Sequence, residues 1–421
     1  MQSSIKLRLT VMNFLQFAVW GAYLTSMGRY LGTAGFGSEI GNFYAMQGLV
    51  SLFMPALMGI VADRWIPAQR LLGVCHTLAG MLMLGVFLYT QTDAPSYPSL
   101  FALYSLSVAF YMPTLALSNS VAYTSLDQAG LDLVKSFPPI RVFGTVGFIC
   151  TMIAVSLLGL EATSGQFAVS AIISLVLAVY AQTLPNCPTA PKGQSKSLVE
   201  ALGLRAFVLF KQRKMALFFI FSMLLGVSLQ ITNGFANPFI STFGEIPAYA
   251  DTFGVKYANI LISLSQLSET LCILLIPFAL RRFGIRRVML IAMVAWVLRF
   301  ALLGLGNPGS GVWLFLLSMI VYGVAFDFFN VSGSLFVDKE TDPSIRSSAQ
   351  GLFMIMTNGI GATLGSLGAQ AVINRFVYSQ SEATAILSGW SMSWYVFAGY
   401  AAVVAVLFAL LFRYNTATEA K

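Results

Sequence analysis

The sequence predicts an all-α membrane protein with twelve transmembrane helices in two pseudo-symmetric six-helix halves. Three observations support this prediction: the apolar composition, the spacing of the apolar runs and the placement of Lys and Arg. Of the 421 residues, 57% are hydrophobic and 10% are charged, whereas soluble proteins average about 25% charged residues. This composition excludes a soluble enzyme, a disordered chain and a nucleic-acid-binding module.

Twelve apolar runs follow one another, each close to the length of about 20 residues that crosses a bilayer. Because the bilayer core contains no water, such runs should be helices that satisfy their own backbone hydrogen bonds. The runs are Leu9–Leu31, Ile40–Ala62, Leu71–Thr90, Ser99–Ala122, Phe137–Leu158, Phe167–Leu184, Met215–Ile240, Tyr257–Leu280, Val288–Gly306, Trp313–Val337, Ser347–Phe376 and Trp390–Phe412.

Lys and Arg gather on one side of the predicted membrane. When the N-terminus is placed in the cytoplasm, all of the 24 basic residues except Arg29, Lys256, Arg299 and Arg375 fall on or near the cytoplasmic side. Cytoplasmic loops of membrane proteins carry such an excess. We therefore expect both termini in the cytoplasm, and the net charge of +8 reflects topology and not nucleic-acid binding.

The longest polar connection, Pro185–Lys214, separates two sets of six runs. We expect six-helix bundles at residues 1–184 and 215–421, joined by a cytoplasmic linker at 185–214. Within the linker, the spacing of apolar residues predicts a short helix lying on the membrane surface. These residues are Leu198, Leu202, Phe207 and Phe210.

Corresponding motifs occur in the two halves. Ile140–Arg141 opens the fifth run and Ile345–Arg346 opens the eleventh, and a phenylalanine follows each arginine after seven residues. Transporters built from repeats bind their substrate near the membrane midplane between the halves. The alternative is a chance similarity of short basic segments.

Only two of the sixteen acids, Glu269 and Asp327, lie deep inside the runs. An acid at bilayer depth costs about 2.5–3.5 kcal/mol on insertion scales, so a function is the default interpretation. Burial disfavours the charged form of a carboxyl group, which suits a carrier of protons. The alternative is an acid that a neighbouring donor holds for packing alone.

Amide side chains flank these acids. Gln266 precedes Glu269 by three residues, and Gln230 precedes Asn233 by three, so each pair shares a helix face. Amides donate and accept hydrogen bonds, which suits a neutral polyhydroxylated or heterocyclic ligand. Hydrogen bonding between helices is the alternative.

Further candidate contacts are aromatic or cationic. Tyr322 and Phe326 lie beside Asp327, where rings could stack on a planar base or simply pack. Arg141, Thr145 and Phe148 share one face of the fifth run, as a ligand site or as a snorkelling arginine with two packing residues. Arg299 lies within a run and has no evident partner in the sequence.

The remaining chemistry is sparse. No GxxxxGK[ST] phosphate-binding loop is present, so ATP-driven transport is not expected, and no nucleophile–base constellation or metal cluster indicates an enzyme. The single histidine, His76, is interpreted as a packing residue near a helix start. Buried small hydrophobes are predicted for the four cysteines, Cys75, Cys150, Cys187 and Cys272.

Several motifs resemble one known family. GIVADRW at 59–65 is similar to a loop motif of the major facilitator superfamily. More specifically, FPPIRVFGTVGF (137–148), LQITN (229–233), SQLSET (265–270) and MIVYGVAFDFFN (319–330) resemble the nucleoside:proton symporters. The resemblance implies a major facilitator fold and proton-coupled uptake of nucleosides by alternating access across a bacterial inner membrane.

By motif, the resemblance assigns nucleoside binding to Arg141, Thr145, Phe148, Gln230, Asn233, Gln266, Glu269, Tyr322, Phe326 and Asp327, with proton coupling at Asp327 and Glu269. It implies nucleosides such as uridine, adenosine or xanthosine as ligands, a monomer in the lipid bilayer and no cofactor beyond the proton gradient. A proton-coupled sugar transporter of the same fold is the nearest alternative, and a membrane receptor is a more distant one.

Overall fold

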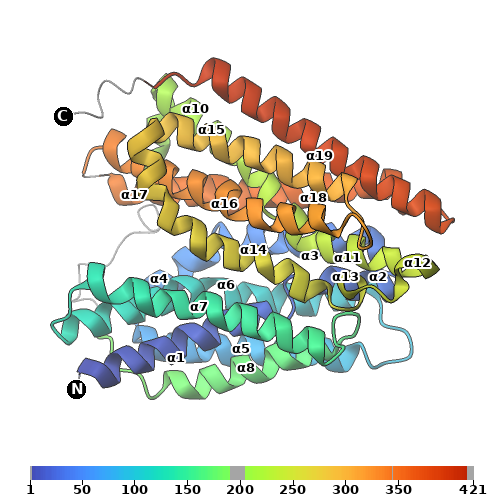
Figure 1. The fold of residues 1–421 in the computed structure, drawn as a ribbon. Coiled ribbons are helices and arrows are strands. Elements are labelled where there is room, and N and C mark those ends of the chain that lie inside the picture. Colours follow the sequence, from blue (N-terminus) through green and yellow to red (C-terminus); the bar gives the residue numbers. More distant parts are fainter. Residues whose placement is uncertain (1, 190–203, 344, 415–421) are drawn as a thin grey trace. The chain divides into compact units, whose positions relative to one another are not determined.

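The computed structural model describes residues 2–189, 204–343 and 345–414. Within these ranges the chain is helical, with no β-strand. It divides into two compact units (Figure 1). Unit 1 takes the described residues of Met1–Tyr30 and Leu49–Leu202, and unit 2 takes those of Leu31–Gly48 and Gly203–Lys421.

Unit 1 consists of long helices joined by short turns. They are α1 (Gln2–Gly21), α4 (Met54–Arg64), α5 (Ala68–Tyr89), α6 (Tyr97–Gln128), α7 (Leu133–Leu157) and α8 (Gly165–Ala181), with the start of α2 (Met27–Thr33). Its core includes Leu9, Leu72 and Val121, each fully buried. Burial of one such side chain stabilises the fold by about 1.5–3 kcal/mol.

Unit 2 contains the remaining helices and several short helical turns. They are η1 (Gly37–Glu39), α3 (Ile40–Ser51), η2 (Leu204–Lys211), α10 (Arg213–Leu229), α11 (Ile231–Thr242), η3 (Phe243–Glu245), α12 (Pro247–Ala250), α13 (Phe253–Lys256), α14 (Ala258–Cys272), η4 (Ile273–Leu275), α15 (Ile276–Leu305), α16 (Val312–Glu340), α17 (Arg346–Met354), η5 (Ile355–Gly361), α18 (Ala362–Phe376) and α19 (Ala383–Leu411).

Each of the twelve predicted runs coincides with one of these helices or with consecutive helices. Among the described residues, nine helical stretches are long and apolar enough to cross a membrane by length and composition. One of the nine, Ala258–Leu305, contains two predicted runs, and the run in α8 is shorter at 17 residues. The all-α membrane fold is confirmed, while length alone does not give the number of crossings.

Two of the breaks between helices have a local cause. Pro55 lies at the start of α4, and because its ring clashes with the carbonyl group four residues earlier, α3 ends at Ser51. Within α15, Gly284 has φ of 74° and ψ of 164°, a conformation that glycine adopts without strain. This glycine separates the eighth and ninth predicted runs.

The predicted surface helix in the linker is only partly within the described ranges. Leu198 and Leu202 lie outside them. Residues 204–211 form the 3₁₀ helix η2, in which Phe207 and Phe210 stack with ring centroids 5.8 Å apart. Phe210 also contacts Phe219 of α10 at 5.5 Å, so this end of the linker is tied to unit 2.

Glycines set the closest helix crossings in both units. In unit 1, a Cβ at Gly147 of α7 would overlap the carbonyl oxygen of Phe14 in α1. In unit 2, a Cβ at Gly365 of α18 would overlap the carbonyl oxygen of Val227 in α10. Small residues allow such close approach in membrane helices. The first and fifth runs of each half therefore pair in the same way, as pseudo-symmetric halves require.

The segment Leu31–Gly48 packs with unit 2, although it lies between two parts of unit 1 in the sequence. The backbone N–H of Gly41 donates to the Gln370 side chain, whose Nε2 donates to the carbonyl oxygen of Gly37 at 3.0 Å. A Cβ at Gly48 would lie 2.9 Å from the carbonyl oxygen of Gly359. The predicted division at the 185–214 linker stays a prediction.

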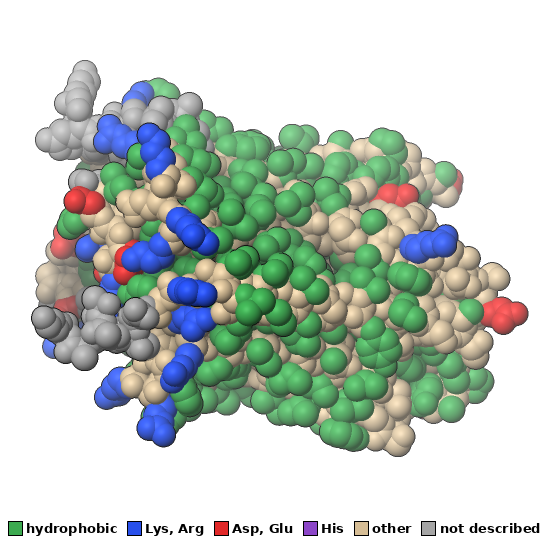
Figure 2. Space-filling model, turned by 90° about the horizontal axis from the view of Figure 1, so that it is seen from above, with side chains coloured by type: hydrophobic (Ala, Val, Ile, Leu, Met, Phe, Trp, Pro, Cys, Tyr) green, Lys and Arg blue, Asp and Glu red, His purple; other side chains and the backbone are tan. Residues whose placement is uncertain are grey.

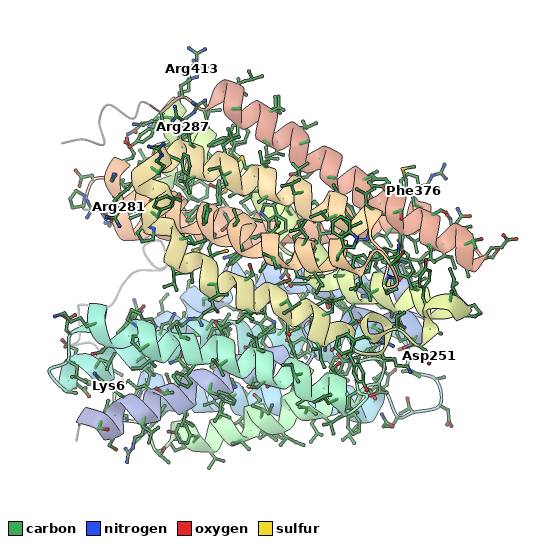
Figure 3. The ribbon with its side chains drawn as sticks, viewed as in Figure 1. Lys6, Asp251, Arg281, Arg287, Phe376 and Arg413 are labelled. Carbon is green, nitrogen blue, oxygen red and sulfur yellow. The ribbon has the colours of Figure 1, made fainter. Side chains whose placement is uncertain are left out.

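Several basic side chains of unit 2 lie at one end of its helices. Figure 3 places Arg281, Arg287 and Arg413 at the end opposite Asp251. On the face in Figure 2, hydrophobic side chains cover a broad middle region, and blue Lys and Arg side chains gather to one side of it. An apolar belt with a basic margin is the distribution expected of a membrane-spanning bundle.

The prediction for the cysteines is wrong at one position. Cys75, Cys187 and Cys272 are buried, but Cys150 is exposed. It shares the outer face of α7 with Phe143, which is 45% exposed, and Val146. A membrane helix presents apolar side chains to lipid as well as to its neighbours, so an apolar run alone does not identify the buried face.

The glycine crossing of α10 and α18 predicts a contrast between two alanine variants of one helix. Both Gly365→Ala and Gly368→Ala improve helix propensity by about 1 kcal/mol. We expect Gly365→Ala to be destabilising, since overpacking costs about 1–3 kcal/mol or more, while Gly368→Ala is neutral or stabilising because nothing lies within 4 Å of its added Cβ. Thermal unfolding in detergent measures both, and equal midpoints would contradict the crossing.

Candidate functional site

Unit 2 contains a buried carboxyl group. Asp327 on α16 is 5% exposed. Within the described part of the chain, its Oδ2 receives no hydrogen bond. An ionised carboxylate without full compensation is costly in such a place. A bound proton or a ligand donor would remove that cost.

Gln266 and Glu269 of α14 lie against the same helix. A Cβ at Gly323 of α16 would lie 2.5 Å from the carbonyl oxygen of Ser268, so the two backbones touch there. Gln266 is 8% exposed, Glu269 is half-buried, and the Glu269 carboxyl group interacts electrostatically with that of Asp327. The two deep acids predicted from the sequence thus belong to one cluster.

Arg299 of α15, which had no evident partner in the sequence, contacts α14 and α16, the two helices that carry these acids. It is 2% exposed, and its guanidinium carbon lies 4.4 Å from the ring centroid of Tyr322. Its Nη1 donates to the carbonyl oxygen of Ser318 at 2.8 Å and to Ser265 Oγ at 3.3 Å. This cation fixes one face of the Tyr322 ring, and a desolvated cation–π contact is worth about 2 kcal/mol.

Tyr322 also belongs to an aromatic stack. The ring of Phe326, one turn later on α16, lies 5.6 Å away at an interplanar angle of 16°. Trp296 of α15 meets Tyr322 edge-on at 5.9 Å. Tyr322 is buried and Phe326 is half-buried, so Phe326 is the ring of this stack with more room for a further planar group.

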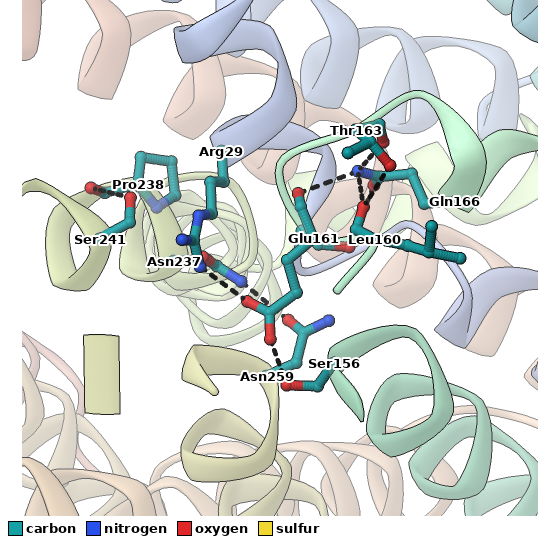
Figure 4. Close-up of polar contacts among 11 residues, drawn as sticks. Arg29, Ser156, Leu160, Glu161, Thr163, Gln166, Asn237, Pro238, Ser241 and Asn259 are labelled. Carbon is teal, nitrogen blue, oxygen red and sulfur yellow. Dashed lines mark hydrogen bonds and ion pairs between the residues drawn. The ribbon is translucent and has the colours of Figure 1, made fainter. Parts of the chain in front are cut away.

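Gln230 and Asn233 lie where α10 gives way to α11. Gln230 is the single residue between the two helices, and Asn233 Nδ2 donates to its Oε1 at 2.8 Å. Both side chains are half-buried. Further along α11, Asn237 Nδ2 donates to Asn259 Oδ1 of α14 at 2.9 Å, as Figure 4 shows, and this bond ties α11 to the helix that carries Gln266.

Unit 1 contributes the predicted face of α7. The guanidinium carbon of Arg141 lies 4.0 Å from the ring centroid of Phe17 on α1. Phe148 is 6% exposed and meets Trp20 edge-on at 6.4 Å, while Thr145 between them is half-buried. Arg141 therefore lies across an aromatic ring of α1.

The ten predicted site residues fall into two groups. Unit 2 holds seven of them, which lie on α11, α14 and α16 and at the junction of α10 with α11, and unit 1 holds three on α7. Their assignment to ligand and proton binding stays a prediction. The sequence pointed to Arg299 by its depth, but its contacts with Ser318 and Tyr322 depend on how α15 and α16 pack.

Glu161 is a buried acid that the sequence did not single out, because it lies in the turn between α7 and α8. It is 3% exposed. Arg29 Nη1 lies 3.3 Å from its Oε2, and Ser156 donates to its Oε1 (Figure 4). Gln166 Nε2 donates to its backbone carbonyl at 3.0 Å. A loop position at a helix end thus does not imply exposure, and this ion pair joins α2 to the α7–α8 turn.

Comparison with known proteins assigns this arrangement to a family. A family model described as "Nucleoside H+ symporter" matches residues 3–417. The xanthosine permease of Escherichia coli (strain K12) is 49% identical over 98% of this chain and 97% of its own length. The nucleoside permease NupG of the same organism is 47% identical with the same coverage.

Solved structures agree with these relatives. The crystal structure of the nucleoside transporter NupG superimposes with a TM-score of 0.89, at 46% identity, over 98% of this chain and all of that one. A POT family peptide transporter superimposes with a TM-score of 0.69 at 16% identity, which shows the fold alone. The predicted major facilitator fold is confirmed.

The setting of Arg299 predicts a difference between two substitutions. Arg299→Met keeps most of the side-chain volume and removes a buried charge, a change that is often neutral or stabilising. Arg299→Ala leaves a cavity instead, and truncation of this kind costs about 2–5 kcal/mol. We expect the thermal unfolding midpoint to hold or rise in the methionine variant and to fall in the alanine variant. The reverse order would show that the charge itself stabilises the fold.

Proposed function

Because the chain belongs to the nucleoside H+ symporter family, we propose that it carries nucleosides into the cell together with protons, by alternating access. Its relatives are permeases and transporters, not enzymes. The protein is accordingly a multi-pass membrane transporter. The names of the relatives specify xanthosine for one and nucleosides for another, so the proposed substrate class is nucleosides in general.

The observation that carries the proposal is the state of Asp327. Its buried Oδ2 lacks a hydrogen-bond donor within the described chain, and Glu269 adds a second carboxyl group close by. Two neighbouring acids in an apolar setting favour sharing or gaining a proton over ionising together. A proton that enters this cluster neutralises its charge before the site changes its access from one side of the membrane to the other, which is the coupling that a symporter needs.

The groups around the acids suit a nucleoside. Gln230, Asn233 and Gln266 offer amide donors and acceptors for ribose hydroxyls and base edges. Phe326 offers an aromatic face to a base. In unit 1, Arg141, Thr145 and Phe148 offer a cationic donor, a hydroxyl and an aromatic ring. Loss of one such neutral hydrogen bond costs about 0.5–1.5 kcal/mol.

The setting in the cell is part of the proposal. We place the protein in a bacterial inner membrane as a monomer, with both termini in the cytoplasm and with the proton gradient as its energy source, without a cofactor. The distribution of Lys and Arg supports this orientation. A periplasmic signal from a reporter fused to the C-terminus would overturn it.

A competition experiment tests the substrate class. Purified protein in proteoliposomes takes up labelled uridine under an inward proton gradient, while unlabelled nucleosides, free bases and sugars compete. We expect nucleosides to inhibit uptake and sugars to have no effect. Inhibition by sugars alone would instead identify a proton-coupled sugar transporter of the same fold.

The two acids predict a separation of binding from coupling. If Asp327 or Glu269 carries the proton, Asp327→Asn or Glu269→Gln should lose accumulation driven by a proton gradient. It should retain counterflow, which moves no net proton, provided that the amide still contacts the ligand. We favour Asp327, because its neighbours Phe326 and Phe328 exclude water more than those of Glu269.

The matched control for these variants is Glu382→Gln, since Glu382 is an exposed acid just before α19. It should retain both accumulation and counterflow. If both acid variants bind nucleoside and still accumulate it uphill under a proton gradient, these acids do not carry the proton.

A further inference from the structure

Arg299 of α15 is a buried cation that has no part in the proposed binding of ligand or proton. It is 2% exposed, and among the residues that the structure describes it forms no ion pair. A guanidinium group does not lose its proton in a protein, so the charge is permanent. Because a charge at bilayer depth is costly and is functional by default, the contacts of Arg299 indicate its role.

Two reciprocal hydrogen bonds hold Arg299 against α16. Its Nη1 donates to the backbone carbonyl oxygen of Ser318 at 2.8 Å, and the Ser318 hydroxyl donates to the backbone carbonyl oxygen of Arg299 at 2.9 Å. Both acceptors are carbonyl oxygens, which can only accept, so the direction of each bond is determined. Ser318 is fully buried. The guanidinium group is therefore fixed relative to the backbone of α16.

The same nitrogen of Arg299 also contacts α14. It donates to Ser265 Oγ at 3.3 Å, and Ser265 Oγ lies 3.0 Å from the sulfur of Met319 on α16. Ser265 is 1% exposed, and it directly precedes Gln266, a predicted ligand contact. One guanidinium group thus contacts both helices of the acid cluster, next to Gln266.

The guanidinium group also restrains the ring of Tyr322. Its carbon atom lies 4.4 Å from the ring centroid, and the ring centroids of Phe326 and Trp296 lie 5.6 and 5.9 Å away. Of these three neighbours, Arg299 is the one that hydrogen bonds hold in place. Removal of the guanidinium group should therefore loosen the Tyr322 ring more than it loosens the helices.

The hydroxyl group of Tyr322 is available to a ligand. In the described part of the chain, no hydrogen bond reaches this hydroxyl. The phenol interacts electrostatically with Glu269 and Asp327, the two acids of the cluster. Buried tyrosine hydroxyls usually have a hydrogen-bond partner. The ring is thus held near the acids while its polar atom has both a donor and an acceptor to offer.

From these contacts we infer that Arg299 is a positioning residue for nucleoside binding, which acts by holding the Tyr322 hydroxyl in place for the ligand. Arg299 itself contacts neither ligand nor proton. A hydrogen bond weakens steeply when its angle is poor, so a hydroxyl on a loosely held ring binds a ribose or base less well. The inference rests on the proposed function and adds a residue to it.

A double-mutant cycle tests the action through Tyr322. Equilibrium binding of labelled uridine is measured for the wild type, Arg299→Met, Tyr322→Phe and the double variant. We expect each single variant to weaken binding by roughly 2- to 10-fold, as for the loss of one hydrogen bond. The double variant should bind about as well as Tyr322→Phe, because the hydroxyl that Arg299 holds is then absent. Additive losses, or no loss in Arg299→Met, would overturn the inference.

Arg286→Met on the same helix is the matched control. Arg286 is half-buried and donates to the backbone carbonyl oxygens of Phe412 and Ala409 at 2.6 and 2.7 Å. Its substitution also removes a guanidinium group that is bound to carbonyl oxygens, but it leaves Tyr322 untouched. Uridine affinity should stay close to that of the wild type. An equal loss in the two methionine variants would show a general effect on packing and would contradict a positioning role.

Arg299→Lys provides a milder second variant. Lysine keeps a cation that can lie over the ring but lacks the planar group with its fixed set of donors. We expect it to weaken uridine binding less than Arg299→Met. The cycle with Tyr322→Phe can be repeated with this variant if the methionine variant is not recovered as folded protein. Weaker binding by the lysine variant than by the methionine variant would contradict a role of the cation in holding the ring.

A measurement without ligand separates this inference from the proposed function. Site-specific incorporation of 3-fluorotyrosine in place of Tyr322 gives a single ¹⁹F NMR signal for the protein in lipid nanodiscs. We expect this signal to shift or broaden in Arg299→Met and to stay unchanged in Arg286→Met. An unchanged signal in both variants would show that Arg299 does not restrain the ring and would overturn the inference alone. Failure of the wild type to bind any nucleoside would instead contradict the proposed function.

Discussion

The bilayer core offers no hydrogen-bond partner, so every polar side chain within it depends on what neighbouring helices bring against it. Arg299 meets this constraint with the ring of Tyr322 and the carbonyl oxygen of Ser318. His76 meets it with Gln16 and Ser174. Asp327 meets it incompletely, and an incomplete set of donors is what gives a proton or a ligand something to add.

Glycines decide which of these groups can meet. The contact of α14 with α16 at Gly323 places the backbone of Ser268 against α16. This crossing brings Glu269 of α14 near Asp327 of α16. In unit 1, Gly147 lets α7 approach Phe14 of α1, so that Arg141 reaches Phe17 three residues further on. A side chain at either crossing would separate the polar groups as well as the helices.

The sequence predicted the features that depend on a single segment of the chain. Hydropathy located the helices, and the depth of Glu269, Asp327 and Arg299 within their runs marked them as unusual. It could not predict the partners of Arg299, because these depend on the rotation of α15 relative to α16. For the same reason it gave Cys150 a buried position although that face of α7 points outward.

The position of a residue in the sequence also fails to predict its burial where another part of the chain covers it. Glu161 lies in a turn, and its cover comes from Arg29 and Ser156. The contacts of His76 with Gln16 and Ser174 could not be predicted from the sequence either, since the three side chains come from α5, α1 and α8. The family resemblance supplied the fold and the transport class, while the roles of the ten site residues await measurement.

The packing of Leu31–Gly48 with unit 2 has a consequence for synthesis. Gly41 is translated 329 residues before Gln370, with which it finally bonds. At about 5–20 residues per second, that interval is on the order of tens of seconds. Throughout it, the glycine face of α3 must be covered by lipid or by the insertion machinery. Unit 2 cannot be completed from its own stretch of chain, because one of its helices is among the first parts of the protein to be made.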